Sequence, residues 1–301
     1  MQIISTVRFF EATLFALSAF VGCTGSDTKP VRVGYVRGEN ALPLYVAMEK
    51  KLFSQSRIQP FEYANSSMLA RELAQGTLDV AVGMDVITWS NLRSRFPNNF
   101  QVIGGAIETQ RRSKSDLLRI NRPRAARPTT TSMLRVRLTD PTLLTRLIFR
   151  RIEVPRDTEV EIVQLPLLNA FEAELQHSPV DMILSTSTIL TYRLLKSGTW
   201  SVFVANPFCR YVSDPFPLGV IVASQEFMRR YPRDASAMKD VFDAAIDSIR
   251  SDEVGARKTL GMSLAFDSSA ASNFVCGDWW KSSEVKDTVI NEIARIIDKE
   301  R

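Results

Sequence analysis

The sequence predicts an α/β protein of two lobes, each built around a mostly parallel β-sheet. Short runs rich in β-branched residues alternate with helical patterns of about ten residues, which is typical of βαβ units. The alternation is interrupted at about residues 110–134 and then resumes, so that it forms two series. A chain of 301 residues, of which 45% are hydrophobic, is long and apolar enough to bury two such cores.

The first series and the C-terminal third are expected to form one lobe. Pro43 stands at a helix start, where its missing N–H costs no hydrogen bond, and Ser66 or Ser67 is expected to cap the next helix. The predicted strands cover 31–35, 58–63, 80–84, 101–107 and 219–223, and the predicted helices cover 43–53, 66–76, 86–95, 225–231, 235–250 and 285–299.

The second series is expected to form the other lobe. Between the two series, residues 111–137 carry nine Lys and Arg and a single acid, Asp116. We interpret this basic segment as a solvated loop, and the alternative is a patch that faces anionic headgroups or a partner. The predicted strands of the second lobe cover 135–139, 160–164, 182–185 and 200–205, and its predicted helices cover 141–151, 168–176 and a segment that reaches residue 196.

The composition argues against metal chemistry and catalysis. One His and three Cys cannot build a zinc site of four cysteines, a His-rich metal site or a dense disulfide scaffold, so we expect neither a metal nor a cofactor. His177, the single candidate for a catalytic His, is expected in a surface turn. The sequence contains no G-x-S-x-G, P-loop or G-x-G-x-x-G motif. We therefore expect a protein that is not an enzyme, and a net charge of only +5 argues against nucleic acid as a partner.

The N-terminus has the features of an export signal. Arg8 precedes an apolar run of eleven residues, from Ala12 to Gly22, which is too short for the roughly 20 residues that span a bilayer but fits a signal peptide. Val21-Gly22-Cys23 resembles the lipobox of bacterial lipoproteins, although Phe20 stands where Leu is usual. This resemblance implies removal of residues 1–22, a diacylated (palmitate-bearing) Cys23 and a tether over 23–30. An ordinary cleaved signal with a chance Cys is the alternative.

Export also affects how the remaining thiols are interpreted. Cys209 and Cys276 could form a disulfide in an oxidising compartment. Two separately buried thiols are the alternative, because the sequence does not show whether the two residues lie close together.

Two motifs indicate a family. The stretch from Val31 to Phe53 (VRVGYVRGENALPLYVAMEKKLF) resembles the start of the SsuA-like solute-binding proteins of ABC importers, which take nitrate, alkanesulfonates, taurine or thiamine-pyrimidine precursors. In that family a strand ending in Gly-Tyr leads to a P-L-Y-V-A-x-E-K-G-x-F helix, and Lys51 replaces its Gly. The stretch from Ala70 to Gly83 is similar to the family's A-L-x-x-G-x-x-D-x-A pattern, and residues 165–184 are a weaker match. The motif that usually opens the second lobe is absent from residues 134–140.

The resemblance implies a two-lobed fold of the type II periplasmic-binding-protein class, with a ligand cleft between lobes that close by a hinge. It implies a monomer that is anchored to the cell membrane, faces the periplasm or cell exterior, and delivers a small nitrogen- or sulfur-containing solute to an ABC transporter permease. An enzyme on the same fold, such as a pyrimidine-precursor synthase or a dehydratase, and a sensory domain are the alternatives. The expected divisions are 1–22 (signal), 23–30 (tether), 31–108 (first lobe), 109–214 (second lobe) and 215–301 (return to the first lobe and C-terminal helices).

Ligands of open α/β sheets bind beyond the carboxyl ends of the strands, near helix N-termini. Asn40 is the first candidate, and several of the hydroxyls and Asp85 are alternatively helix caps. Carboxylates at Glu39, Asp85 and Asp140 would repel an anion unless they are paired, which favours a neutral or cationic nitrogenous solute such as an aminopyrimidine. The expected ligand-binding residues are Asn40, Ser66, Ser67, Asp85, Thr139, Asp140, Thr142, Thr186, Ser187 and Phe216.

Overall fold

The fold is taken from a computed structural model. It describes residues 29–53, 57–112, 114–121, 133–138, 143–152, 159–164, 182–266, 271–274 and 276–300. The predicted signal peptide, Cys23 and the predicted helix over 168–176 lie outside these residues, as do Thr139, Asp140 and Thr142.

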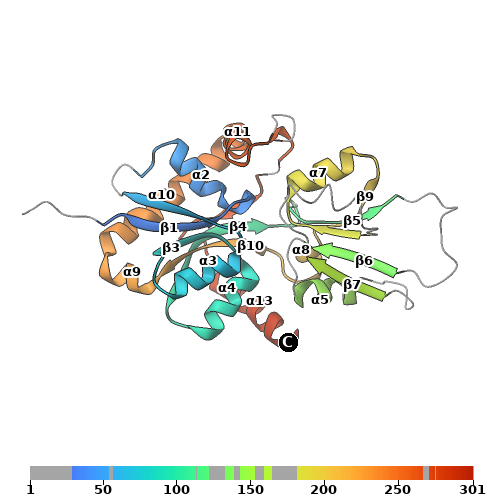
Figure 1. Ribbon diagram of the computed structural model, residues 1–301, viewed down its shortest axis with the longest axis horizontal. Coiled ribbons are helices and arrows are strands. Elements are labelled where there is room, and N and C mark those ends of the chain that lie inside the picture. The colour runs from blue at the N-terminus through green and yellow to red at the C-terminus, as the bar shows by residue number, and fades with distance from the viewer. Residues whose placement is uncertain are drawn as a thin grey trace, which may run out of the picture. The chain divides into compact units, whose positions relative to one another are not determined.

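The first sheet has six strands in the order β11-β4-β10-β3-β1-β2 (Figure 1). The pairs β1–β2 and β1–β3 are parallel, whereas β10 and β11 pair antiparallel with their neighbours, so four of the six strands run in one direction. The strands are β1 (Val31–Val36), β2 (Ile58–Tyr63), β3 (Val80–Asp85), β4 (Phe100–Glu108), β10 (Phe216–Ser224) and β11 (Asp278–Trp280).

Helices cover both faces of this sheet (Figure 1). Because β10 is buried along its whole length, its sequence is a continuous apolar run rather than an alternating one. On one face lie α2 (Leu42–Glu49), α10 (Pro232–Ser251) and α11 (Glu253–Leu264), with α9 (Gln225–Arg230) beside α10. On the other lie α3 (Ser66–Ala74), α4 (Val86–Arg95) and α13 (Asp287–Glu300).

The second sheet has five strands in the order β7-β6-β8-β5-β9, and β5 is its single antiparallel member. The helix α7 (Thr188–Lys196) packs on one face, and α5 (Leu143–Arg151) and α8 (Pro207–Tyr211) pack on the other (Figure 1). The strands are β5 (Asp116–Ile120), β6 (Met133–Leu138), β7 (Glu159–Gln164), β8 (Met182–Ser185) and β9 (Trp200–Ala205).

The interpretation of residues 111–137 as a solvated loop is wrong for residues 114–120, which the structure describes. This segment contains β5, which lies between β8 and β9 and buries Leu117 and Leu118. Arg112 is paired with Glu253, and Lys114 is buried. The strand escaped prediction because only two apolar residues stand among charged ones, which is a weak signal for a strand of five residues. The helix α11 and the short strand β11 were not predicted either.

The helix that follows the first motif is shorter than predicted. A 3₁₀ turn, η1 (Glu39–Ala41), precedes α2, which ends at Glu49 instead of Phe53. Lys51 has the left-handed conformation (φ 56°), with its N–H donated to Met48 O and the N–H of Leu52 donated to Ala47 O. This is a Schellman ending, which usually has Gly at that position. Lys51 therefore ends the helix as the family's Gly would, at a cost in backbone strain.

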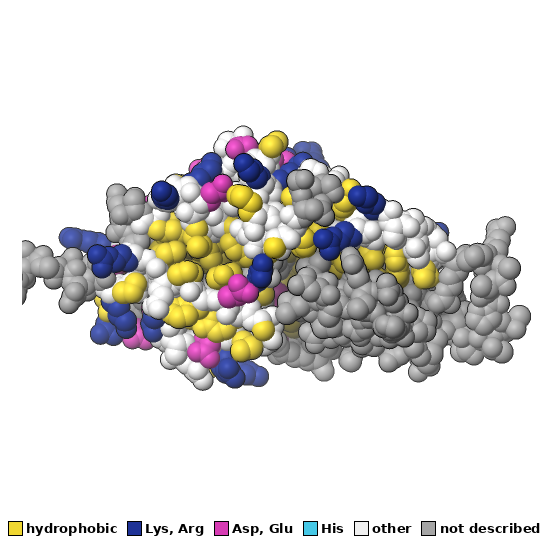
Figure 2. Space-filling model, turned by 45° about the horizontal axis from the view of Figure 1, so that its top comes forward, with side chains coloured by type: hydrophobic (Ala, Val, Ile, Leu, Met, Phe, Trp, Pro, Cys, Tyr) yellow, Lys and Arg dark blue, Asp and Glu magenta, His cyan; other side chains and the backbone are white. Residues whose placement is uncertain are grey.

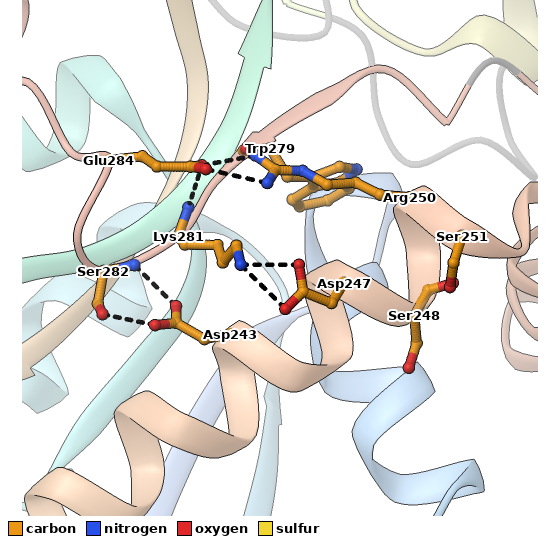
Figure 3. Close-up of polar contacts among 9 residues, drawn as sticks. All are labelled: Asp243, Asp247, Ser248, Arg250, Ser251, Trp279, Lys281, Ser282 and Glu284. Atoms are coloured by element: carbon orange, nitrogen blue, oxygen red, sulfur yellow. Dashed lines mark hydrogen bonds and ion pairs between the residues drawn. The ribbon is translucent and has the colours of Figure 1, made fainter.

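Polar contacts fix β11 and the turn after it to α10 (Figure 3). Arg250 pairs with Glu284 at 2.5 Å and donates to the backbone carbonyl of Trp279. The ammonium of Lys281 lies 2.8 Å from Asp247. These ion pairs hold the edge strand of the first sheet against the helical layer.

Charged side chains of both signs are interspersed on the described part of the face shown in Figure 2, around a band of hydrophobic side chains. In the part of the chain that the structure describes, every helix is too short or too polar to cross a bilayer.

Candidate functional site

The carboxyl ends of β1 and β8 meet through Glu39. Glu39 follows β1 on η1, and it is 8% exposed. Its Oε1 accepts hydrogen bonds from the Ser187 hydroxyl (2.6 Å) and the Ile189 amide (3.2 Å). Its Oε2 accepts from the amide and the hydroxyl of Thr188, each at 3.2 Å. A carboxylate of the first sheet's lobe is thus bound by four donors of the second.

These donors form the N-terminus of α7. Ser187 is its N-cap, and the Ser187 hydroxyl accepts from the Leu190 amide at 3.3 Å. The Thr191 amide donates to the Ser187 carbonyl. This last bond is an ordinary helical one. The amides of Thr188, Ile189 and Leu190, which a helix alone leaves without partners, are satisfied by Glu39 and the Ser187 hydroxyl. The positive end of the helix dipole also favours the negative charge placed there.

A buried lysine accompanies Glu39. Lys114 is 1% exposed, and its ammonium has no hydrogen-bond partner among the described residues. It lies 4.4 Å from the ring centroid of Trp279 and 5.7 Å from that of Phe274. Burial lowers the pKa of Lys114 to about 8, against the opposing charge of Glu39. Burial raises the pKa of Glu39, whereas the Ser187 hydroxyl and the charge of Lys114 oppose that rise.

Lys114 belongs to one of two connections between the sheets, 109–115 and 206–215. The Lys114 amide donates to the Glu108 carboxylate at 3.1 Å, and the Cys209 thiol donates to the Glu108 carbonyl at 3.1 Å. The Asn206 amide donates to the Ser115 carbonyl at 3.1 Å. These bonds tie the two connections together. Burial, and then the charge of Glu108, raise the pKa of Asp116 at the start of β5 to about 7.

Asn40 packs against one glycine of β3 and one glycine of β10. Gly83 and Gly219 face η1, and a Cβ at Gly219 would lie 2.8 Å from the Asn40 side chain. The half-buried Asn40 amide has no hydrogen-bond partner among the described residues. Its donor and acceptor groups are therefore available to a ligand.

Two of the candidate ligand-binding residues that follow β2 and β3, Ser66 and Asp85, make structural hydrogen bonds. The cap of α3 is Asn65, which accepts from the Met68 amide, so the prediction of Ser66 or Ser67 as its cap is wrong. The Ser66 hydroxyl instead accepts from the Asp85 amide at 3.1 Å, and Ser67 is exposed. Asp85 caps α4, with bonds from the amides of Ile87 and Thr88 and the Thr88 hydroxyl.

Two further predicted residues lie near the second sheet and the connections. Thr186 is half-buried beside Ser187, between β8 and α7. Phe216 is buried and stacked on Phe208, with ring centroids 4.6 Å apart, so it packs in the core. Ser187 therefore belongs to the contact with Glu39, whereas Phe216 does not.

Cys209 and Cys276 are both free and buried, and the structure has no disulfide between them. The Cys276 thiol donates to the carbonyl of Glu253. The alternative of two separately buried thiols is the one observed.

Sequence reasoning named Glu39 only as a charge that would repel an anion, and it did not single out Lys114. The partners of Glu39 are 148–150 residues away, so no local pattern indicates the contact. An acidic residue three positions after the last residue of β1 was the one available signal.

Metal sites and other hollows are the remaining candidates in the part of the chain that the structure describes. Among the described residues, no three His, Cys, Asp or Glu side chains are grouped so as to hold a metal ion. A groove of about 660 Å³ runs beside β11, but Arg112 and Arg250 in its wall are already paired with Glu253 and Glu284.

Comparisons of sequence and structure give different results. No family model matches the sequence, and neither does any curated protein. Among solved structures, the alkanesulfonate-binding protein SsuA from Xanthomonas axonopodis pv. citri, bound to MOPS, matches with a TM-score of 0.65 and 15% identity over 90% of this chain and 95% of that one. The aliphatic sulphonate binding protein SsuA from Escherichia coli matches with a TM-score of 0.67 and 13% identity, over 90% and 92%. The nitrate-binding protein NrtA from Synechocystis PCC 6803 matches with a TM-score of 0.59 and 12% identity, over 86% and 74%.

These likenesses define the fold. The chain has the two-lobed α/β fold of periplasmic binding proteins, with sheets in which most strands are parallel. The fold class and the structural resemblance predicted from the sequence are confirmed.

Proposed function

We propose that the protein is an extracytoplasmic solute-binding lipoprotein of an ABC importer. It captures a small nitrogen- or sulfur-containing solute by hinge closure and delivers it, as a monomer, to the transporter permease. The observation that carries this proposal is the meeting of strand ends from both sheets at Glu39 and Ser187, beside two connections that can act as a hinge. Ligands bind at such a junction in open α/β sheets, and lobes joined in this way close around them.

The solved structures support the same role. Those that match over about nine tenths of the chain include proteins that bind alkanesulfonates. The fold alone does not define the solute, and this chain differs from the family at the start of the second lobe. Asn40, whose side-chain amide has no partner in the part of the chain that the structure describes, is the residue that we expect to contact the solute.

A thermal-shift screen of the mature protein tests the proposal. Sulfonates, nitrate, taurine, polyamines and pyrimidines are added one at a time, and a true solute raises the melting temperature. The variant N40A should lose most of that rise, whereas N98A, which removes an exposed amide from the turn before β4, should keep it. A solute recovered chemically unchanged after binding supports transport, and turnover would instead support an enzyme on this fold.

Membrane anchoring needs its own experiment. We propose that the protein is exported and held at the membrane by a lipid on Cys23. Metabolic labelling with a radioactive fatty acid should mark the protein, and the variant C23S should remain unlabelled. Equal labelling of both proteins would contradict the lipoprotein assignment without affecting solute binding.

A further inference from the structure

The carboxylate of Glu39 is saturated with hydrogen bonds. An ionised carboxylate offers about four acceptor sites, and Glu39 receives four bonds, two on each oxygen. All four donors come from residues 187–189, and all are 2.6–3.2 Å away. The side chain is therefore bound in the way that a separate anion would be bound.

The surroundings of the carboxylate suit an anion for two independent reasons. The N-terminus of α7, a helix of nine residues, offers amides and the positive end of its dipole. The ammonium of Lys114 is buried over the rings of Trp279 and Phe274 with no hydrogen-bond partner among the described residues, and its positive charge acts on Glu39. Burying a cation without a hydrogen-bond partner costs free energy, and the charges of Glu39, Glu108 and Asp278 offset part of that cost. Negative charge at Glu39 therefore also favours the buried ammonium.

We propose that Glu39 is an internal ligand: its carboxylate fills an anion-binding site at the N-terminus of α7 and excludes external anions from it. The site belongs to the second lobe, and the first lobe supplies the anion. This inference rests on the geometry of Glu39 and deepens the proposed function, because it restricts the solute. A sulfonate, nitrate or carboxylate group cannot use these donors while Glu39 holds them. We therefore expect a neutral or cationic solute beside η1, because the donors that would hold an anionic group are already occupied.

The variant E39A should leave the anion-binding site empty, with the shape of the carboxylate that was removed. Replacing Glu by Ala removes one methylene and one carboxylate, which together have nearly the size of acetate. Acetate should therefore bind to E39A and restore the lost contacts. The control E226A removes a carboxylate from the exposed surface of α9, where it is 3.9 Å from Arg230, and creates no such vacancy.

Melting temperatures are compared in sodium acetate and in sodium chloride of equal ionic strength. We expect acetate to raise the melting temperature of E39A by about 2–4 °C more than chloride does. The wild type and E226A should show no such difference. The variant E39Q, whose side chain still fills the site, should also gain nothing from acetate.

Two results would overturn the proposal. One is an acetate effect on E39A no larger than that on E226A. The other is an equal stabilisation of the wild type by acetate, nitrate or methanesulfonate, because the site would then be open to anions. If E39A does not fold in chloride, the yield of refolded protein in acetate against chloride replaces the melting temperature. The assay contains no transported solute, so its result is independent of whether the solute screen succeeds.

Discussion

The Ser187 hydroxyl donates a hydrogen bond of 2.6 Å to the Glu39 carboxylate, across 148 residues of sequence. Ser187 also caps α7, so one side chain both completes a helix and connects the two lobes. Glu39, which follows β1, and the N-terminus of α7 are therefore in direct contact. Substitutions at either residue should affect stability and solute binding together.

The variant S187A should destabilise the protein by about 1–2 kcal/mol. It removes the cap of α7 and one of the four donors to a buried carboxylate. Urea unfolding measures the loss. The matched control is S67A, which removes an exposed hydroxyl and should change the unfolding free energy by less than about 0.5 kcal/mol. An S187A protein as stable as S67A would show that the contact contributes nothing.

The elements of the fold were predictable because their signals are local. The strands over 58–63 and 200–205 and the helix over 86–95 have the predicted bounds, since each is a periodic or apolar run between clear ends. The predicted residues Asn40 and Ser187 also lie at strand ends, because the order of strands and helices largely determines which residues are there.

The charged part of the site was not predictable in the same way. Glu39 and Lys114 are residue types that are mostly exposed, and their burial depends on tertiary contacts far away in sequence. The strand β5 was missed for a related reason, because its burial comes from its neighbours β8 and β9 rather than from its own pattern. Tertiary context therefore determines the site's electrostatics, whereas local sequence determines its location.

Replacing Lys51 by Gly should stabilise the protein by about 0.5–1 kcal/mol. Lys51 has φ 56°, which is strained for a residue with a Cβ and free for Gly. Part of the gain is offset by the greater freedom of Gly in the unfolded chain. Thermal or urea unfolding measures the difference. The adjacent variant K50G is the control: Lys50 has φ −80°, so Gly should bring no gain there. Equal effects at the two positions would contradict the strain at Lys51.

The ion pair of Glu284 with Arg250 should contribute stability that acid removes. The hydrogen bonds from Arg250 lower the pKa of Glu284 to about 2, from 4.5. Its contribution is therefore complete above pH 4.5 and is lost as the pH falls toward 2. Because the Glu284 side chain is 39% exposed, we expect the ion pair to contribute only about 1 kcal/mol to the unfolding free energy.

The variant E284Q should be less stable than the wild type at pH 7, and this difference in unfolding free energy should narrow between pH 4.5 and 3. The exposed pair of Glu226 with Arg230 is the control, since E226Q should show almost no difference at either pH. A difference for E284Q that stays constant with pH would contradict the assignment.

Lys114 should give the protein a measurable dependence on alkaline pH. Its pKa in the folded state is about 8, against 10.5 when unperturbed, so the unfolded chain binds more protons between these values. Stability from this group therefore rises as the pH increases from 8 to 10.5, by roughly 3 kcal/mol at most. Tyr45 and the two buried thiols have raised pKa values in the folded protein, so their titration opposes this rise in stability. The pH dependence of the wild type alone therefore does not isolate Lys114, and the test compares variants.

The difference in unfolding free energy between the wild type and K114M should shift in favour of the wild type from pH 7.5 to pH 10. The control K258M replaces an exposed lysine of α11 and should keep a constant difference from the wild type. A constant difference for K114M as well would contradict the lowered pKa of Lys114 in the folded protein.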